Sequence, residues 1–322
     1  MLDIIVPHYR EPWSVGEKFF AMLDLQRGIR FEDFHVIIVN DGPENHLPDE
    51  LFADRPYAVR QLDIPHAGVS AARNAGIEAA TEPWIMFCDF DDMFSHVYAL
   101  RDYLTVLPAE GYDMLHSCMI VEDMTEGKDL LIYSPDSQRF VFLHGKVYRR
   151  QFLLDEGLRF DETMNFQEDS LFNAEVIART PHTRIGEIKV GAAPYIWIRR
   201  DASVTNSGRE DEAMYSHFLR NLKVTAENLE HRGHEHYCGM VTRTAWDAYH
   251  MMRKHGASAA IKRKILEQFI PWMRERMDAY GQVSDDILEQ IRTVSRNELA
   301  DHLVPDSPED VKNWLMTLCG GE

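Results

Sequence analysis

The chain has 322 residues, with 34 lysines and arginines against 53 aspartates and glutamates, a formal net charge of −19 at pH 7. This acidity argues against a general nucleic-acid-binding protein, which needs a basic surface to meet phosphates. Hydrophobic residues make up 45% and charged residues 27% of the chain, a globular composition rather than a disordered or fibrous one. The length is sufficient for one large domain or two of ordinary size.

Cysteine usage and hydropathy bear on the compartment of the protein. The chain has no CxxC pair, and its widely spaced cysteines are typical of reduced thiols: Cys88, Cys118, Cys238 and Cys319. No run approaches the roughly 18 apolar residues of a membrane-spanning helix. The N-terminal MLDIIVPHYREPW lacks the basic and apolar regions of a secretory signal. We therefore expect a cytoplasmic protein, with a peripheral place at the inner membrane face as the alternative.

The first part of the chain alternates short apolar runs with stretches of helical spacing. Runs rich in β-branched and aromatic residues predict strands at Leu2–Val6, Val36–Val39, Val59–Ile64 and Trp84–Cys88. The small-residue segment Gly68–Ala80 predicts a helix between the third and fourth strands. Later strands are expected at Met114–Val121, Leu130–Tyr133, Arg184–Val190 and Tyr195–Arg199. Such alternation is typical of an α/β fold with a mostly parallel sheet flanked by helices.

The second part of the chain is predicted to be entirely helical. The charge and the hydrophobic pattern change near residue 206, so we predict one domain over residues 1–206 and a helical region over residues 207–322. Apolar residues at helical spacing predict helices at Glu210–His231, His236–His255, Ala257–Tyr280, Ser284–Arg292 and Val311–Leu318. Three roles fit this region equally well: a wall of the acceptor site, homo-oligomerisation, or docking of a partner.

An acidic segment follows the fourth predicted strand. The strand ends in Cys88-Asp89-Phe90-Asp91-Asp92, at the carboxyl edge where open α/β sheets bind ligands. Because side chains alternate along an extended chain, Asp89 and Asp91 are expected to share one face while Asp92 points elsewhere. Two such carboxylates suit a hard divalent cation that also holds a diphosphate. The competing interpretation is an acidic strand end that only begins a turn.

Four segments, in this order and spacing, resemble family 2 glycosyltransferases with the GT-A fold. They are Val6–Tyr9 (VPHY), Val39–Gly42 (VNDG), Gly68–Ile77 (GVSAARNAGI) and Ile85–Asp92 (IMFCDFDD). The resemblance covers about residues 1–205 of the chain. It implies an inverting enzyme that moves a sugar from a nucleotide-sugar donor, such as a UDP-sugar, to an acceptor hydroxyl.

The resemblance implies roles for residues near the nucleotide. Pro7 and Tyr9 would wall the base, and Asp41 would accept a hydrogen bond from the uracil or the base–ribose edge. Arg73 and Asn74 lie on a predicted helix whose small residues let it approach the nucleotide and the sugar. These five residues form the expected donor site together with the acidic segment.

The resemblance also assigns the acidic segment. Asp89 would lie near the ribose or the sugar, and Asp89 and Asp91 would bind a divalent cation, Mn²⁺ or Mg²⁺, with Asp91 as the better ligand. Such a cation neutralises the diphosphate leaving group. Residues 199–205 contain no histidine, although some relatives supply a metal ligand there. A third protein ligand is therefore left unassigned.

Further matching segments lie in the second half of the predicted domain. Glu168-Asp169 opens a predicted helix, where carboxylates are also favoured simply by the helix dipole. The resemblance implies that Asp169 is the general base that deprotonates the acceptor hydroxyl, without a covalent intermediate. Lys146 is either a phosphate contact or a solvated lysine. The residues of a closing segment expected over the donor, or alternatively on a plain surface, are Arg199, Arg200 and Ser203.

The acceptor and the rival functions complete the prediction. The expected acceptor is a glycan, a wall polymer, a lipid-linked intermediate or a protein, and a nucleic acid fits poorly with the net charge. One rival is a catalytically idle nucleotide-binding module with the same fold. Another is a nucleotidyl- or sugar-phosphate transferase on a similar sheet. Such enzymes usually carry a Gly-rich, basic phosphate loop after the first strand, where this chain has Pro7-His8-Tyr9-Arg10.

Overall fold

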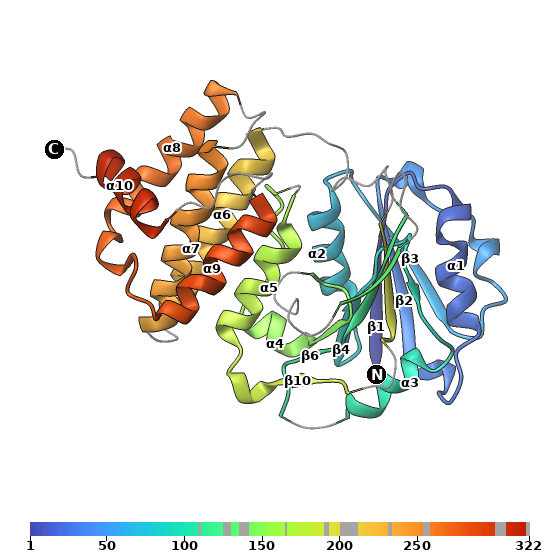
Figure 1. Ribbon diagram of the computed structural model, residues 1–322. Coiled ribbons are helices and arrows are strands. Elements are labelled where there is room, and N and C mark those ends of the chain that lie inside the picture. Colours follow the sequence, from blue (N-terminus) through green and yellow to red (C-terminus); the bar gives the residue numbers. More distant parts are fainter. Residues whose placement is uncertain are drawn as a thin grey trace. The chain divides into compact units, whose positions relative to one another are not determined.

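The computed structural model describes residues 1–108, 111–124, 130–134, 142–164, 166–189, 193–199, 212–230, 234–253, 258–299 and 307–319. The chain divides into two compact units, Met1–Ser207 and Gly208–Glu322. The first unit contains the strands, and the second is helical (Figure 1).

A seven-stranded sheet forms the centre of the first unit. Its strands, in spatial order, are β10 (Ile185–Glu187), β6 (Met114–His116), β9 (Lys146–Arg149), β4 (Trp84–Phe87), β1 (Leu2–His8), β2 (Phe34–Asp41) and β3 (Ala58–Ile64). All neighbours pair in parallel except β9, which runs antiparallel to both β4 and β6. The prediction of a mostly parallel sheet is confirmed. The short antiparallel strand β9 was not predicted.

Helices cover both faces of this sheet. They are α1 (Trp13–Asp24), α2 (Val69–Ala79), α3 (Ala99–Val106), α4 (Arg150–Asp155) and α5 (Glu168–Arg179). Alternate residues of β1 serve opposite faces: Ile4 joins the apolar cluster that contains α1 and α3, whereas Ile5 joins the cluster that contains α2 and α5. Helices α1 and α2 accordingly lie on opposite sides of the strands (Figure 1). Gly76 lets α2 approach β1 closely, since a Cβ there would lie 2.3 Å from Ile5 Cγ2.

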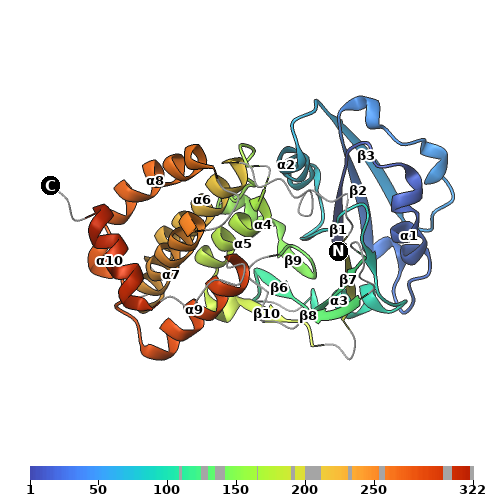
Figure 2. The same ribbon diagram turned by 45° about the horizontal axis from the view of Figure 1, so that its top comes forward.

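A second sheet lies beside the first. It has four strands in the order β5 (Met93–Phe94), β11 (Tyr195–Arg199), β7 (Met119–Asp123) and β8 (Leu130–Ser134). The predicted single strand Met114–Val121 was wrong, because the chain passes from β6 to β7 and changes sheet between them (Figure 2). Ser117 makes this change possible: its N–H donates to Gly145 O at 2.9 Å, and its hydroxyl donates to Cys118 O at 3.0 Å.

The second unit is a helical region, as predicted. Its helices are α6 (Glu212–Leu229), α7 (His234–Arg253), α8 (Ala259–Arg274), α9 (Asp285–Leu299) and α10 (Pro308–Cys319). Helix α7 is central, packing against the other four, and its Trp246 is almost fully buried. Ser258 caps α8 by accepting a hydrogen bond from the N–H of Ile261 at 3.2 Å. The unit thus has an apolar core of its own.

Candidate active site

The carboxyl ends of three neighbouring strands define the candidate site. Strand β1 pairs with β2 on one side and with β4 on the other. The order of the strands therefore reverses at β1, with later strands on both of its sides. The crevice outside such a switch point is where open α/β sheets bind ligands. Pro7 lies in β1, Tyr9 follows it, Asp41 ends β2, and Asp89 follows β4. The sequence thus identified one edge of the sheet correctly.

Asp41 is bound to the loop that follows β3. One carboxylate oxygen accepts the N–H of Ala67 at 2.7 Å. The other accepts the N–H of Gly68 at 2.9 Å and lies 2.8 Å from Nδ1 of His66. The Asp41 residue is only 3% exposed. The hydrogen bonds of this carboxylate therefore hold the loop that leads into α2 in place.

Tyr9 and His66 form a stacked aromatic pair at this edge. Their ring centroids are 4.5 Å apart and their planes differ by 8°. The Arg10 guanidinium lies 4.8 Å from the Tyr9 ring centroid, and Arg10 adopts a positive φ of 62°. Pro7 is partly buried within β1, in register with Val39. The edge expected to hold the base therefore presents flat side chains.

The acidic segment is arranged differently from its prediction. Strand β4 ends at Phe87, and the N–H of Asp92 donates to Asp89 O at 3.2 Å, so residues 89–92 form a turn rather than an extended strand. Asp92 consequently faces Asp89 instead of pointing elsewhere. Both carboxylates lie near Nε2 of His144, at 3.4 Å for Asp89 and 3.3 Å for Asp92. Asp91 stays partly exposed beside them.

Within the described part of the chain, Asp89, Asp92 and His144 are the cluster that could hold a metal ion, with ligand atoms within 4.8 Å of one another. Two carboxylates and an imidazole fit a divalent cation of the Mn²⁺ type. Both oxygens of Asp92 are already engaged, one by Tyr195 Oη at 2.8 Å and the other by the N–H of Ile198 at 2.9 Å. Asp92 therefore ties the turn to β11. Asp89 is the more available ligand, because its side chain is 33% exposed and that of Asp92 is fully buried.

Strong charge interactions surround His144. Burial disfavours its imidazolium, but the hydrogen bonds and negative charges of Asp89 and Asp92 outweigh this and raise the His144 pKa to about 9. Although burial alone would raise the pKa of Asp89, the charges of Arg73 and His144 hold it well below its usual range. Burial raises the pKa of Asp92 to about 6. Asp89 thus stays ionised to a lower pH than Asp92.

Arg73 links the acidic turn to the start of α5. Its guanidinium donates to Asp89 at 3.0 Å and to Glu168 at 2.8 Å, while the side chain is only 6% exposed. Together with His144, it completes a chain of alternating charges from Asp92 to Glu168. The negative neighbours raise the pKa of Arg73 despite its burial. Arg73 thus joins two acidic groups that lie 79 positions apart in the sequence.

Asn74 is engaged in hydrogen bonds within the protein. Its amide nitrogen donates to Phe160 O and to Glu162 Oε1, both at 2.9 Å, and its carbonyl oxygen accepts the N–H of Phe160 at 2.8 Å. The residue is 7% exposed. These bonds fasten α2 to the segment before α5, so Asn74 acts on the site through the position of α2.

Asp169 lies in the first turn of α5. Gln167, in a left-handed conformation with φ of 58°, precedes the helix, and one oxygen of Asp169 accepts the N–H of Ser170 at 2.7 Å. Burial and the neighbouring charge of Glu168 raise the Asp169 pKa to about 6, against the opposing effects of Arg73 and His144.

The remaining predicted residues divide into three groups. Lys146 is buried at 2% exposure and donates to Phe142 O, so the solvated alternative was wrong. Arg199 lies 3.4 Å from Asp123, with its guanidinium 5.5 Å from the Trp197 ring centroid. Arg200 and Ser203 lie outside the described residues.

Comparison with known proteins agrees with this geometry. The family model described as glycosyl transferase family 2 matches residues 3–169. This chain belongs to glycosyltransferase family 2. The matched region contains the acidic turn and ends at Asp169, directly after Glu168.

Two bacterial relatives illustrate the family. The uncharacterized glycosyltransferase EpsJ of Bacillus subtilis is 27% identical over 255 residues, covering 72% of this chain and 71% of EpsJ. The minor teichoic acid biosynthesis protein GgaA of the same species is 24% identical over 246 residues, covering 70% of this chain and 53% of GgaA. The match thus spans about half the length of GgaA.

A solved structure confirms the GT-A fold. TarS of S. aureus (residues 1–349), in complex with UDP-GlcNAc, superposes with a TM-score of 0.67 and 17% identity, over 98% of this chain and 90% of the other. Within the described residues, no helix has the length and apolar character needed to cross a membrane.

Several site residues escaped sequence reasoning. His66 lies two residues before the GVSAARNAGI segment, and His144 lies two residues before Lys146, but neither histidine was assigned a role. Glu168 was noted only as a partner of Asp169. Glu168 stands next to the predicted base in the sequence, whereas His66 and His144 lie 25 and 55 positions from their partners Asp41 and Asp89, so no local signal marks the two histidines.

Proposed function

We propose that this family 2 member transfers a sugar with inversion from a nucleotide-sugar donor, of which a UDP-sugar is the preferred form, to an acceptor hydroxyl. The observation that supports this most directly is the Arg73 bridge, which holds Asp89 at the donor edge and Glu168 beside Asp169. A carboxylate with a pKa near 6 is then fixed relative to the donor edge. Such a carboxylate is suited to remove a proton at neutral pH.

Asp169 is the proposed general base. It accepts the proton of the acceptor hydroxyl while that oxygen attacks the anomeric carbon, on the face opposite the departing diphosphate. The bond to the diphosphate breaks as the new glycosidic bond forms, so the configuration inverts. A second carboxyl group acting as general acid is unnecessary, in contrast to glycoside hydrolases.

Asp89, Asp91 and the imidazole of His144 are the proposed surroundings of a divalent cation, Mn²⁺ or Mg²⁺. When bound, such a cation neutralises the diphosphate leaving group. Asp89 also remains ionised through Arg73, and Asp92 maintains the turn through Tyr195 and Ile198. The acidic turn is therefore preorganised by the chain itself.

The relatives guide the choice of substrates. TarS binds UDP-GlcNAc in its solved complex, and GgaA is named for minor teichoic acid biosynthesis. By analogy, we place a UDP-hexose or UDP-N-acetylhexosamine first among the donors. The proposed acceptors are a glycan, a wall polymer, a lipid-linked intermediate or a protein. We therefore propose that the protein acts in the cytoplasm, with the inner membrane face as the alternative location.

The second unit is proposed to be a separate functional domain. It has its own apolar core, so it is suited to completing an acceptor site, to homo-oligomerisation or to docking a partner. Size-exclusion chromatography with light scattering, on the full chain and on a chain ending at residue 207, tests the oligomerisation role. A dimer formed only by the full chain would support it.

The decisive experiment is a donor screen. The full chain is incubated with UDP-, GDP- and CDP-sugars, with Mn²⁺ or Mg²⁺ and then with a chelator, and release of nucleoside diphosphate is measured. We expect release from a UDP-sugar that stops with the chelator. Binding of UDP without any turnover, for every acceptor class tested, would favour the idle binding module. An α-linked product from an α-linked donor, seen by nuclear magnetic resonance, would contradict inversion.

A further inference from the structure

The stacked pair of Tyr9 and His66 bears on which nucleobase the site would bind. His66 is 55% exposed at its side chain, whereas its partner Asp41 is 4% exposed. Among the described residues, Nδ1 of His66 bonds Asp41 at 2.8 Å and Nε2 has no protein partner. The pair lies where β1 and β3 end, beside the switch point of the sheet. One ring nitrogen is thus anchored, and the ring that carries the other is more than half exposed.

The contacts of Asp41 determine which nitrogen of His66 carries the hydrogen. Asp41 accepts the backbone N–H groups of Ala67 and Gly68, so it is an acceptor in this cluster. It must also accept from His66, which places the hydrogen on Nδ1. A neutral imidazole has one donor and one acceptor nitrogen. Nε2 of His66 is therefore an acceptor that points outward.

The ring geometry determines how a base would meet this acceptor. The lone pair of Nε2 lies in the plane of the imidazole, so a base that donates to it lies close to that plane. The plane of His66 differs from that of Tyr9 by only 8°. A base paired edge to edge with His66 would therefore lie parallel to the Tyr9 ring, the orientation in which bases stack on aromatic side chains.

We propose that His66 determines nucleobase specificity by accepting the N3–H of uracil at Nε2, and that Asp41 is the positioning residue that fixes its tautomer. The inference rests on the proposed function, since it takes a uridine diphosphate as the ligand. Cytosine has a lone pair at N3 in place of the N–H, so two acceptors would face each other. An acceptor held in this way therefore favours UDP over CDP.

This assignment changes the role expected for Asp41 from the sequence. Its carboxylate already accepts three hydrogen bonds, so direct contact with the base is the weaker interpretation. Replacing it with asparagine offers an amide N–H to Nδ1 of His66. The hydrogen of His66 then moves to Nε2, which becomes a donor suited to cytosine N3. A loss of structure alone would weaken UDP and CDP binding alike.

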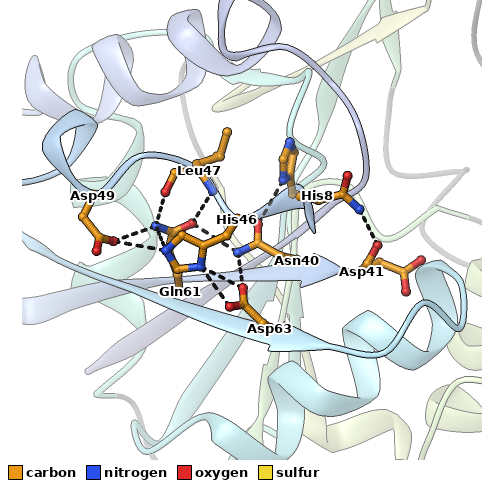
Figure 3. Close-up of polar contacts among 9 residues, drawn as sticks. His8, Asn40, Asp41, His46, Leu47, Asp49, Gln61 and Asp63 are labelled. Carbon is orange, nitrogen blue, oxygen red and sulfur yellow. Dashed lines mark hydrogen bonds and ion pairs between the residues drawn. The ribbon is translucent and has the colours of Figure 1, made fainter. Parts of the chain in front are cut away.

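The chain offers a matched control in His46. Its Nδ1 lies 2.9 Å from Asp63, and it is 39% exposed, so it is also a surface histidine held by an aspartate. Asn40 and Asp41 are consecutive in β2 and point to opposite faces. Figure 3 shows His46 and Asp63 grouped with Asn40, away from the side chain of Asp41. Substituting His46 should leave base preference unchanged.

The experiment compares the dissociation constants of UDP and CDP by titration calorimetry, with the same divalent cation throughout, in the full chain. The variants are His66→Phe, which retains stacking on Tyr9, His66→Gln, which retains an acceptor near Nε2, Asp41→Asn, and the control His46→Phe. Melting temperatures establish that each variant is folded.

We expect wild type to prefer UDP by about 10-fold or more, and His66→Phe to lose most of that preference through weaker UDP binding. His66→Gln should preserve the preference, Asp41→Asn should reduce or reverse it, and His46→Phe should match wild type. If His66→Phe keeps the full preference, or His46→Phe loses it equally, the assignment is overturned while the proposed function stands. Wild type that binds both nucleotides equally also overturns it. Absence of UDP binding together with absence of transfer is a failure of the proposed function itself, and the inference falls with it.

Discussion

The two ends of the candidate site are held together by different forces. At the base end, Asp41 fixes a loop through two backbone N–H groups and one imidazole, and the flat rings of Tyr9 and His66 complete the surface. At the reaction end, charged side chains alternate from Asp92 through Arg73 to Glu168. Directional hydrogen bonds can recognise a base, whereas buried charges change the ionisation of their neighbours.

This difference shows how one sheet edge can combine recognition and reactivity. At the reaction end, burial and the charge of Glu168 raise the Asp169 pKa to about 6, and the hydrogen bonds and charges of Asp89 and Asp92 raise the His144 pKa to about 9 against the effect of burial. The base end shows geometric order instead, with near-parallel rings. Substitutions at the two ends should therefore separate kcat effects from nucleotide affinity, which makes the comparison testable.

The largest expected effect is at the reaction end, on kcat. Asp169→Asn keeps the size of the side chain and removes the proton acceptor, so kcat should fall by about 10²–10⁴-fold, the usual contribution of a general base. Donor binding should change little, because the base faces the acceptor hydroxyl. Steady-state kinetics with UDP titration calorimetry measures both quantities. The control Glu175→Gln changes a carboxylate of the same helix, and a normal kcat in Asp169→Asn would remove Asp169 from the mechanism.

The second effect concerns stability at the same end. Arg73→Met leaves Asp89 and Glu168 without their shared partner in a largely buried setting. Breaking such a buried pair costs about 3–5 kcal/mol of unfolding free energy. Urea denaturation followed by circular dichroism measures it. Arg179→Met removes a partly exposed arginine from α5, 3.7 Å from Glu175, and should cost far less. Equal losses in both variants would contradict the structural role of the Arg73 bridge.

Much of this site could be predicted from local sequence patterns. The predicted strands Leu2–Val6, Val36–Val39 and Trp84–Cys88 end within two residues of the carboxyl ends of β1, β2 and β4, and α5 begins at Glu168 as expected. These features depend on residues that are neighbours in the sequence. Periodicity and turn chemistry are sufficient to find them.

Other features depend on contacts between distant residues and escaped prediction. The alternation rule failed for Asp92 because residues 89–92 turn, and its partners Tyr195 and Ile198 lie over 100 positions away. The single strand predicted at Met114–Val121 failed because Ser117 bonds Gly145, a contact invisible in local hydropathy. The buried side chain of Asn74 likewise has distant partners, Phe160 and Glu162, that no local pattern reveals.

The third prediction separates the two aspartates that follow Asp89. Asp91→Ala should weaken UDP binding chiefly when the divalent cation is present, and leave the melting temperature near that of wild type. Asp92→Ala leaves the Tyr195 hydroxyl and the Ile198 N–H without their acceptor, which costs about 1–3 kcal/mol for each buried group. Calorimetry with and without a chelator, alongside thermal melts, distinguishes them. If Asp92→Ala has normal stability and weakens UDP binding only when the cation is present, then Asp92 is the metal ligand and the role assigned to Asp91 is wrong.

The smallest expected effect is a shift in pH dependence. Because Asp169 must be ionised to act as a base, wild-type kcat should fall as the pH decreases through about 6, the raised pKa of this group. The Glu168 charge contributes to that increase, together with burial, while Arg73, His144 and the Tyr148 ring also lie near Asp169. Glu168→Gln keeps an oxygen for Arg73 but removes the negative charge, so the pKa of Asp169 decreases.

The acidic limb of the kcat profile should therefore move to lower pH in Glu168→Gln, with a modest fall of the plateau because a weaker base accepts the proton less readily. Glu162→Gln is the matched control, since Glu162 also contacts α2, through Asn74 at 2.9 Å, but is exposed and acts on a different residue. Profiles of kcat from pH 4.5 to 9, at saturating donor and acceptor, measure the acidic limb in wild type and in both variants. If the limb stays in place while Asp169→Asn abolishes turnover, Glu168 only holds Arg73, and the ionisation of Asp169 is set by burial alone. If the limb moves and the UDP-to-CDP preference does not, the base end and the reaction end respond independently, as their different contacts predict.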